Sequence, residues 1–405
     1  MVEINSGIPS SKSMVIRELL IRSYTRGGSN IYAPPKEPEA LEASADIHCM
    51  RQGLACMLRG EVIDCGEAAT VFRFLALRAA RIPGRHQLTG SARLLARPHG
   101  PLISLLNQLS VEVQVHPSHW ILTTNGWCPH SSVIVDRSTS SQFVSGLLLN
   151  SWCLPMPFRF HIGNDVVSES YWRMSCAMAE QFNLDFQVSG EGPHALEEVV
   201  VAAGQIPDMR PAYAAEMDVS CAFALVAAGV LTKGVNVCGF PEVSLQPDYG
   251  FLGILQKMGV KFEFRDANLL VQPCEQLQSI NVDLRQMPDL FPVLAVLTAF
   301  ADGESHLRGA PHLRHKESNR IERISTLIRS MGRGAVIHSD GLSVTGHRQK
   351  QNQATPFYYD VDHDHRLAMA AGVAAVAGIP IKVSDPTVVQ KSFPRFWELL
   401  RRGFL

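Results

Sequence analysis

Three segments in the C-terminal half are apolar on every side, and they constrain the fold more than any other feature. They are Val219–Leu231, Leu290–Phe300 and Leu367–Ile379, and none of them contains a charged residue. Each is shorter than the roughly 20 residues that a helix needs to cross a bilayer. They therefore predict helices that are buried all round inside a domain.

A second pattern joins an amphipathic helix, a turn and a short alternating strand, and it occurs four times. The turns fall at Ser110, Asn183, Gly259 and Gly332, at intervals of 73, 76 and 73 residues. Asn and Gly suit the left-handed backbone position that ends a helix. The regular interval favours repeated α/β units. Chance similarity between amphipathic helices is the alternative.

Size and charge narrow the class of protein. A chain of 405 residues favours two domains. With a net charge of -1 it carries no basic surface typical of nucleic-acid binding, so any anion site has to gather its positive charge locally. The nine cysteines form no C-x-x-C pair, which favours reduced core thiols in a cytosolic protein. Met1–Ser13 lacks an apolar signal segment, so secretion is not expected.

An acid precedes each of the three apolar helices. Asp218 comes before the first, Asp289 before the second, and Asp364-His365-Arg366 before the third. A buried helix presents its free N–H groups and the positive end of its dipole at its start. Three such ends in one place would form an anion site. The alternative is that Asp218 and Asp289 are simple helix caps.

Several short segments place cations or hydroxyls near expected helix starts. Ser13 stands where an N-cap is expected, so Lys12 is predicted just outside its helix. Arg93 and Arg97 precede a helix expected to begin at Pro98, and an arginine can bind a carboxylate or phosphate through two parallel bonds. Ser140, Ser141 and Gln142 open another expected helix with neutral donors. Each segment taken alone is equally typical of a capped surface helix.

The segment Arg314–Arg320 combines cations with an acid. Lys316 and Arg320 are four residues apart, which predicts that they share a helix face. Glu317 beside them would be held ionised by both cations, as a candidate proton carrier. A salt-bridged surface helix is the alternative. Asp362–Arg366 is rich in His and Asp, but no matching cluster elsewhere supports a metal site.

Taken in order, these segments resemble the 5-enolpyruvylshikimate-3-phosphate synthase family from Ser11 to Phe396. The motifs that carry the resemblance are Leu88-Thr89-Gly90 with Arg97-Pro98, Ser140–Phe143, Arg314–Arg320, Asp364–Arg366 and Lys391–Pro394. No phosphate loop or Rossmann fingerprint is present to favour nucleotide chemistry instead.

The resemblance implies an α/β fold, a two-domain inverse α/β barrel in which each domain has three βαβαββ units and buried parallel helices. One domain is expected to comprise residues 13–215, and the other residues 1–12 together with 216–405. The implied enzyme transfers the enolpyruvyl (carboxyvinyl) group of phosphoenolpyruvate to the 5-hydroxyl of shikimate 3-phosphate by addition and elimination, releasing phosphate. It is expected to act in the cytoplasm as a monomer without cofactor or metal, and to bind neither nucleic acid nor membrane.

The resemblance also implies roles for individual residues. The expected catalytic residues are Asp289, Glu317 and Lys12. The expected phosphoenolpyruvate ligands are Lys12, Arg97, Gln142, Arg320, Arg366 and Lys391. The expected shikimate-3-phosphate ligands are Ser13, Arg17, Ser140, Ser141, Gln142, Ser168, Tyr171, Asp289 and Lys316. Asp289 is similar to the group that accepts the hydroxyl proton, and Glu317, assisted by Lys12, to the proton carrier at the methylene carbon.

The chain departs from the family pattern at several positions. Ser10 stands in place of a glycine, Glu67 in place of an Asn, and Glu169 in place of a Lys. His312 replaces an Asn at the shikimate pocket. Ala69 replaces a Gly that lies against phosphoenolpyruvate, which implies reduced sensitivity to glyphosate, an inhibitor of the family.

Two other readings are open. One is the related UDP-N-acetylglucosamine enolpyruvyl transferase, which carries a Cys in the loop before the arginine that matches Arg97, whereas Leu94-Leu95-Ala96 has none. The other is a catalytically inactive relative that serves as a binding module.

Overall fold

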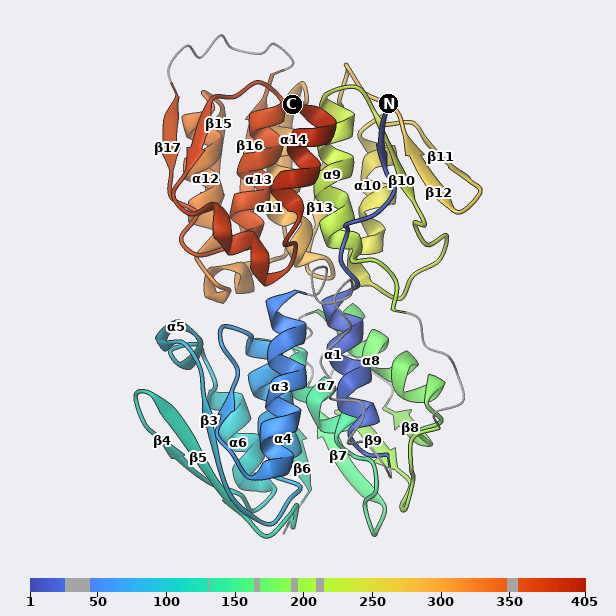
Figure 1. Cartoon of the computed structure of the whole chain (residues 1–405), viewed down its shortest axis with the longest axis vertical. Helices are drawn as coiled ribbons and strands as arrows, with labels where there is room; N and C mark the ends of the chain where they lie inside the picture. The colour runs from blue at the N-terminus through green and yellow to red at the C-terminus, as the bar shows by residue number, and fades with distance from the viewer. Residues whose placement is uncertain (26–43, 130–131, 164–167, 191–195, 209–214, 348–355) are drawn as a thin grey trace. The chain divides into compact units, whose positions relative to one another are not determined.

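The computed structural model describes residues 1–25, 44–129, 132–163, 168–190, 196–208, 215–347 and 356–405, which fall into two compact units (Figure 1). The C-terminal unit includes Met1–Ser11 and Ala215–Leu405. The N-terminal unit includes the helix from Lys12 and the chain from Ala45 to Ala214. That residues 13–215 and 1–12 with 216–405 are separate folding domains stays a prediction.

The C-terminal unit has two four-stranded sheets and one two-stranded sheet among its described residues. Their strand orders are β1-β10-β12-β11, β13-β14-β16-β15 and β17-β18. In both larger sheets the first two strands are parallel and the remaining neighbours are antiparallel. The strands are β1 (Val2–Ile4), β10 (Val235–Cys238), β11 (Phe262–Arg265), β12 (Asn268–Val271), β13 (Asn281–Asp283), β14 (Gly303–Arg308), β15 (Gly334–His338), β16 (Gly341–Gly346), β17 (Phe357–Tyr359) and β18 (Ile381–Val383).

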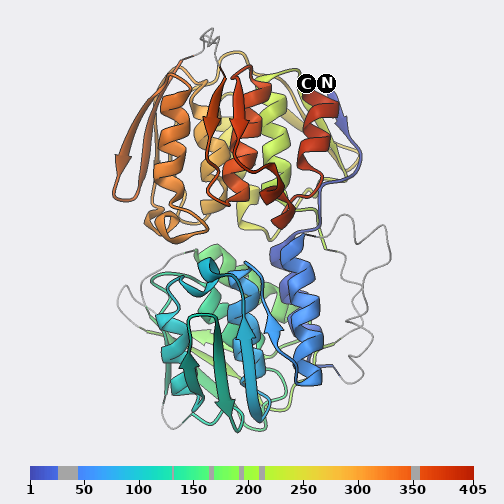
Figure 2. The ribbon, with the colours of Figure 1, turned by 60° about the vertical axis from the view of Figure 1, so that its left-hand side comes forward.

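Three buried helices fill the core of this unit. They are α9 (Val219–Leu231), α11 (Phe291–Thr298) and α13 (His365–Val376), and each contacts the other two. Figures 1 and 2 show them side by side with the sheets around them. Every residue of α11 is buried, which confirms the expectation of helices without a polar face. The second helix starts later than expected because Pro288–Leu290 forms a separate 3-10 turn, η3.

The other helices of this unit lie between strands or follow the last strand, β18. They are η2 (Pro247–Gly250), α10 (Phe251–Lys257), η4 (Pro311–His315), α12 (Arg320–Ser330), η5 (Pro386–Lys391) and α14 (Phe396–Phe404). The start of α12 contradicts the prediction that Lys316 and Arg320 share a helix face. Lys316 ends η4 in an extended conformation, and Asn319 caps α12 by accepting a bond from the Glu322 N–H.

The N-terminal unit repeats the same strand arrangement. Its sheets have the orders β2-β3-β5-β4 and β6-β7-β9-β8, again with a parallel first pair. The strands are β2 (Ile63–Asp64), β3 (Gly84–Thr89), β4 (Glu112–Val115), β5 (His119–Thr124), β6 (Val133–Val135), β7 (Phe158–Ile162), β8 (Phe186–Ser189) and β9 (Glu197–Val201). The described residues thus contain two complete copies of a four-stranded unit on each side of the division, so the prediction of repeated α/β units is confirmed.

The helices of the N-terminal unit pack around α4 (Ala69–Ala79) and α7 (Gln142–Leu149), which contact each other. The others are α1 (Lys12–Arg22), α3 (Ala45–Arg59), α5 (Ala92–Leu95), α6 (Gly100–Gln108) and α8 (Glu169–Gln181). Two expected starts are wrong. Ser11 bonds to the Glu216 carbonyl, so α1 begins at Lys12 and Ser13 is not its cap, and the helix expected from Pro98 begins at Gly100.

The four turns that defined the repeat all adopt the left-handed conformation. The φ angles are 62° at Ser110, 63° at Asn183, 84° at Gly259 and 72° at Gly332. They separate α6 from β4, α8 from β8, α10 from β11 and α12 from β15. The sequence interval therefore marked equivalent positions in four structural repeats. None of the described helices has the length and apolar character needed to cross a membrane.

Candidate active site

The starts of the buried helices in the C-terminal unit carry acids in two different roles. Asp218 caps α9 by accepting a bond from the Cys221 N–H at 2.9 Å, and Asp364 caps α13 by accepting one from the Arg366 N–H at 2.9 Å. Asp289 lies inside η3, and its carboxylate pairs with Arg320 and Arg366. The cap interpretation therefore holds for Asp218, whereas the Asp289 carboxylate is directed to other groups.

Arg320 is the centre of an ionic cluster at these helix ends. Its guanidinium donates to Asp289 Oδ1 at 2.8 Å, to Glu317 Oε2 at 2.9 Å and to Asp364 Oδ2 at 2.8 Å. Arg320 is only 1% exposed. Burial opposes its charge, but the carboxylates of Asp364, Glu317 and Asp289 outweigh burial and raise its pKa. The guanidinium is thus a permanent buried cation.

Arg366 and Lys391 complete this cluster. The Nη2 atom of Arg366 is 3.4 Å from Asp289 Oδ2, and Lys391 Nζ is 3.2 Å from Glu317 Oε1. Burial lowers the pKa of Arg366, but Asp289 and the neighbouring Asp218 and Asp248 outweigh it and raise this pKa. Each of the two cations therefore shares an acid with Arg320.

The three acids of the cluster differ in how far their side chains are exposed to solvent. The Asp364 side chain is 0% exposed, whereas Asp289 and Glu317 are 21% and 14% exposed. Asp364 therefore has a structural role: it holds Arg320, caps α13 and accepts a bond from the Ser318 hydroxyl at 3.0 Å. Asp289 and Glu317 lie at the accessible edge, where a carboxylate can exchange a proton with a bound molecule.

His312 lies near the same cations. It is 8% exposed, and both ring nitrogens are buried with no hydrogen-bond partner among the described residues. Burial and then the neighbouring Lys316 lower its pKa to about 3. The imidazole is therefore neutral at physiological pH, with one donor and one acceptor to offer.

In the N-terminal unit, hydrogen bonds join the starts of α4 and α7. Gln142 donates to the Thr70 hydroxyl at 2.8 Å and accepts from Arg73 Nη1 at 2.8 Å. Arg73 Nη1 also reaches the Ser140 hydroxyl at 3.2 Å, and Ser141 beside it is buried. The predicted group of Ser140, Ser141 and Gln142 is thus organised by two residues of α4.

Arg73 also connects this group with the loop that carries Arg97. Its Nη2 atom is 3.4 Å from the Pro98 carbonyl. His99, in the same loop, is buried, and burial followed by the charges of Arg73 and Arg97 lowers its pKa to about 4. A neutral histidine between two arginines indicates a local concentration of positive charge.

The predicted residues of α1 face different neighbours. Lys12 Nζ forms an ion pair with Asp46 of α3 at 2.8 Å, with 15% of the Lys12 side chain exposed. Arg17 is 2% exposed, donates to the Ser175 hydroxyl at 2.8 Å, and lies over the Phe74 ring. Ser13 accepts a bond from Arg17 through its carbonyl oxygen. Lys12 is thus the more accessible of the two cations.

Ser168 and Tyr171 stand at the start of α8. Ser168 precedes the helix with a φ of 56°, a left-handed conformation that is rare for a residue other than glycine. It is buried, and its carbonyl oxygen accepts a bond from the Tyr171 N–H at 3.0 Å. The structure therefore brings these two predicted residues together.

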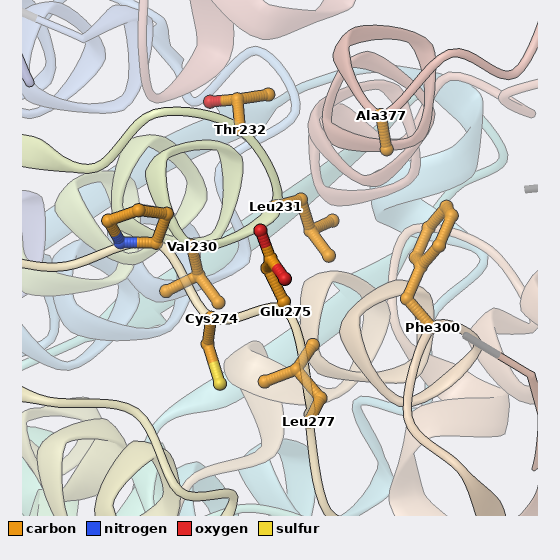
Figure 3. Close-up of a pocket in the computed structure, with 9 residues that line it drawn as sticks. Val230, Leu231, Thr232, Cys274, Glu275, Leu277, Phe300 and Ala377 are labelled. Atoms are coloured by element: carbon orange, nitrogen blue, oxygen red, sulfur yellow. The ribbon is translucent and has the colours of Figure 1, made fainter. Parts of the chain in front are cut away.

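A cavity of about 310 Å³ in the C-terminal unit lies at the opposite ends of the three buried helices (Figure 3). Its lining includes Leu231 at the end of α9, Phe300 after α11, Ala377 after α13 and the carboxylate of Glu275. Helix C-termini carry partial negative charge, so this cavity does not suit a phosphate or carboxylate. Among the described residues, no three His, Cys, Asp or Glu side chains gather as a metal site.

Four residues that shape these groups were not among the predicted site residues. They are Asp364, Asp248, Thr70 and Arg73. Asp364 stands inside a predicted motif, so its position was a usable signal. Asp248 precedes none of the three apolar helices and carries no such signal.

Comparisons with known proteins place the chain in one family. A family model described as EPSP synthase (3-phosphoshikimate 1-carboxyvinyltransferase) matches residues 5–400. A 3-phosphoshikimate 1-carboxyvinyltransferase of Syntrophobacter fumaroxidans is 33% identical over 84% of this chain and 80% of its own length. One from Dehalococcoides mccartyi is 28% identical over 97% and 94% of the two chains.

Solved structures show the same fold. EPSP synthase from Acinetobacter baumannii superposes with a TM-score of 0.69 at 20% identity, covering 100% of this chain and 96% of its own. The enolpyruvyl transferase NikO from Streptomyces tendae superposes with a TM-score of 0.70 at 15% identity, covering 99% and 95%. The two-domain α/β fold is therefore confirmed, and the chain belongs to the EPSP synthase family, the 3-phosphoshikimate 1-carboxyvinyltransferases.

Proposed function

We propose that the chain transfers the enolpyruvyl group of phosphoenolpyruvate to the 5-hydroxyl of shikimate 3-phosphate with the residues predicted above in the predicted roles. The observation that carries the assignment of roles is the Arg320 cluster. One buried guanidinium there is shared by two accessible acids, Asp289 and Glu317, and each acid is also paired with a second cation.

The charges of this cluster suit an anionic substrate. The ion pairs described above join three carboxylates to three cations. A carboxylate or phosphate of phosphoenolpyruvate would compete with Asp289 and Glu317 for Arg320, Arg366 and Lys391. Binding would loosen the two accessible acids from their cations, and this raises their affinity for a proton. The same event would thus fix the donor and prepare the acids.

The proton transfers follow from that arrangement. As the 5-hydroxyl oxygen bonds to the central carbon of phosphoenolpyruvate, its proton passes to the Asp289 carboxylate. The methylene carbon gains a proton from Glu317, assisted by Lys12, to give a tetrahedral ketal phosphate. The phosphate then leaves with the proton that Asp289 had accepted, and a methyl proton returns to Glu317, which completes the transfer and restores both acids. Arg320, Arg366 and Lys391 stabilise the departing phosphate.

The N-terminal unit would bind the acceptor. Ser13 and Arg17 belong to α1, and Ser168 and Tyr171 stand at the start of α8. The group of residues at the starts of α4 and α7 presents hydroxyl and amide donors near Arg73. We propose that these bind shikimate 3-phosphate, together with Ser140, Ser141, Gln142, Asp289 and Lys316. Lys12, Arg97 and Gln142 would contribute to phosphoenolpyruvate binding. We further propose a cytoplasmic monomer that works without metal or cofactor and binds neither nucleic acid nor membrane.

Phosphate release by the purified full chain tests the reaction. We expect release from phosphoenolpyruvate with shikimate 3-phosphate as acceptor and none with UDP-N-acetylglucosamine. Release with only the second acceptor would move the chain to the other transferase, and absence of release with both would indicate an inactive relative. Calorimetric titration with shikimate 3-phosphate measures acceptor binding without turnover.

Asp289→Asn tests the assignment of the base. Because the amide keeps the shape but cannot accept the proton, we expect kcat to fall about 10²- to 10⁴-fold. The dissociation constant for shikimate 3-phosphate should rise less than about tenfold, because at most one hydrogen bond is weakened. Asp266→Asn, in the exposed β11–β12 turn, is the matched control. An Asp289→Asn enzyme with normal kcat would remove Asp289 from the mechanism.

A further inference from the structure

Asp248 is a buried acid behind the Arg320 cluster that the proposed mechanism does not use. It lies in η2 and is 1% exposed. Its Oδ2 atom accepts a bond from the Ser220 hydroxyl in the first turn of α9. Its Oδ1 atom is buried with no hydrogen-bond partner among the described residues. A carboxylate in this position would bury a charge with one oxygen unsatisfied, which is costly.

The turn that carries Asp248 packs against the turn that carries Asp289. Residues of η2 contact both α9 and η3. The approach is so close that a Cβ on Gly250 would lie 2.3 Å from the sulfur of Met287. The charged groups that act on Asp248 are Asp289 from η3, Arg366 from α13 and Asp218 at the cap of α9. Asp248 is therefore one member of the group of charges at these helix ends.

The electrostatics of this group favour a proton on Asp248. Burial and then the negative charge of Asp289 raise the pKa of Asp248 to about 7, although Arg366 and the Ser220 hydroxyl act in the opposite direction. Two neighbouring carboxylates titrate as a coupled pair, so a proton on one favours ionisation of the other. Asp289 is the more exposed of the two, and it has two guanidinium partners.

We infer that Asp248 is a positioning residue that acts through Asp289 and Arg366: it retains a proton in the working enzyme, so that the negative charge of the pair resides on Asp289 and Arg366 stays available to an anion. The inference rests on the proposed roles of those two residues. Asp248 neither gives up nor accepts a proton during a turnover, and the hydroxyl proton of the acceptor still goes to Asp289. When Asp248 ionises, it adds a buried negative charge beside Arg366, which opposes binding of phosphoenolpyruvate.

The test is the pH dependence of KM for phosphoenolpyruvate in three full-length variants. In the wild type we expect KM to rise about tenfold as the pH passes from 6 to 8, because Asp248 gains a charge near the bound anion. Asp248→Asn is a neutral copy of the protonated acid and should lack this rise. Asp266→Asn should behave as the wild type. Ionisation of phosphoenolpyruvate itself is the same for all variants and does not affect their comparison.

Ser220→Ala provides a second test, because it should shift the pH at which KM rises instead of removing the rise. Its hydroxyl donates to Asp248 and stabilises the ionised form, so its removal should move the rise in KM to higher pH by about one unit. A structural defect alone would not shift the pH of the transition. Identical pH profiles in the wild type and Asp248→Asn would overturn the inference, and so would a shift to lower pH in Ser220→Ala.

A measurement without substrate separates this inference from the proposed function. An acid whose pKa is about 7 when folded and 3.8 when unfolded loses folding stability as the pH rises between those values. The unfolding temperature of Asp248→Asn relative to the wild type should therefore increase between pH 5 and pH 7.5. A constant difference would overturn the inference. If this difference increases with pH but the wild type shows no turnover, the inference stands and the proposed function is contradicted.

Discussion

Arg320 illustrates, at the scale of single residues, how one buried cation organises three acids. Its three carboxylate partners lie within 2.8 to 2.9 Å, and only Asp364 is fully buried. Because Asp289 and Glu317 are each shared with another cation, neither acid is held by Arg320 alone. The arrangement allows a ligand to displace either acid without exposing a lone buried charge, which would be costly.

Lys391 is the residue with the simplest test. Its ammonium lies 3.2 Å from Glu317, and the Lys391 side chain is 8% exposed. We expect Lys391→Ala to raise KM for phosphoenolpyruvate about 10- to 100-fold, because a charged hydrogen bond to the substrate is lost. The effect on kcat should be smaller. Lys382→Ala, on an exposed residue of β18, is the control. An unchanged KM, measured by phosphate release, would contradict the assignment.

Ala69 is the first residue of α4 and is 7% exposed. If its methyl group narrows the phosphoenolpyruvate site, Ala69→Gly should lower the glyphosate concentration that halves activity. Steady-state inhibition at a fixed phosphoenolpyruvate concentration measures this. Ala76→Gly, a buried position in the same helix, controls for the loss of helix stability, which is about 1 kcal/mol. Equal inhibition of the wild type and Ala69→Gly would refute the prediction.

At the scale of elements, the starts and ends of helices are the features that the sequence predicts best. Asp218, Asn319 and Asp364 each accept a bond from a backbone N–H at a helix start. The left-handed residues at helix ends recur in all four described repeats. Capping chemistry is local, so these signals are readable in the sequence. Asp289 differs because its carboxylate pairs with Arg320 and Arg366.

Helix α10 offers a matched pair of glycine substitutions. Gly253 is inside the helix with nothing within 4 Å of an added Cβ, so Gly253→Ala should stabilise the protein by up to about 1 kcal/mol. Gly259 ends the helix with a φ of 84°, so Gly259→Ala should destabilise it by about 1–2 kcal/mol. Urea unfolding followed by circular dichroism measures both. Effects of the same sign would contradict the assigned backbone geometry.

At the scale of the whole molecule, a net charge of -1 accompanies a reaction between two strongly anionic substrates. The positive charge is accordingly concentrated at helix starts: Arg320 and Arg366 in the C-terminal unit, and Arg73 with Arg97 in the N-terminal unit. Helix dipoles and buried cations can bind anions locally, without long-range electrostatic attraction from a positively charged surface.

Calorimetry of the full chain tests the predicted division into domains. Most of the proposed shikimate-3-phosphate ligands belong to the N-terminal unit. If the units unfold separately, shikimate 3-phosphate should raise the temperature of only one of two unfolding transitions. At a hundredfold excess over its dissociation constant, the ligand adds about 2.7 kcal/mol to the free energy of unfolding of the unit that binds it. A single transition that moves as a whole would mean that both units unfold as one cooperative block.

Much of the fold was predictable because its signals are local. The apolar helices, the left-handed turns and the caps Asp218 and Asp364 depend on residues that are close in sequence. The predictions that failed concern boundaries. Extended backbone at Ser10 pairs with Met217, so α1 starts at Lys12 rather than after Ser13. Extended backbone at Lys316 likewise removes it from α12.

The sequence by itself determined which residue types are present for the chemistry, and that they stand beside buried helices in repeated units. Only the tertiary structure decided which acid pairs with which cation, how far each is exposed, and that Asp248 lies against Asp289. The physical reason is that these pairings form where the starts of several helices meet. Such helix ends are distant along the chain, and burial and charge act on them only after the core has assembled.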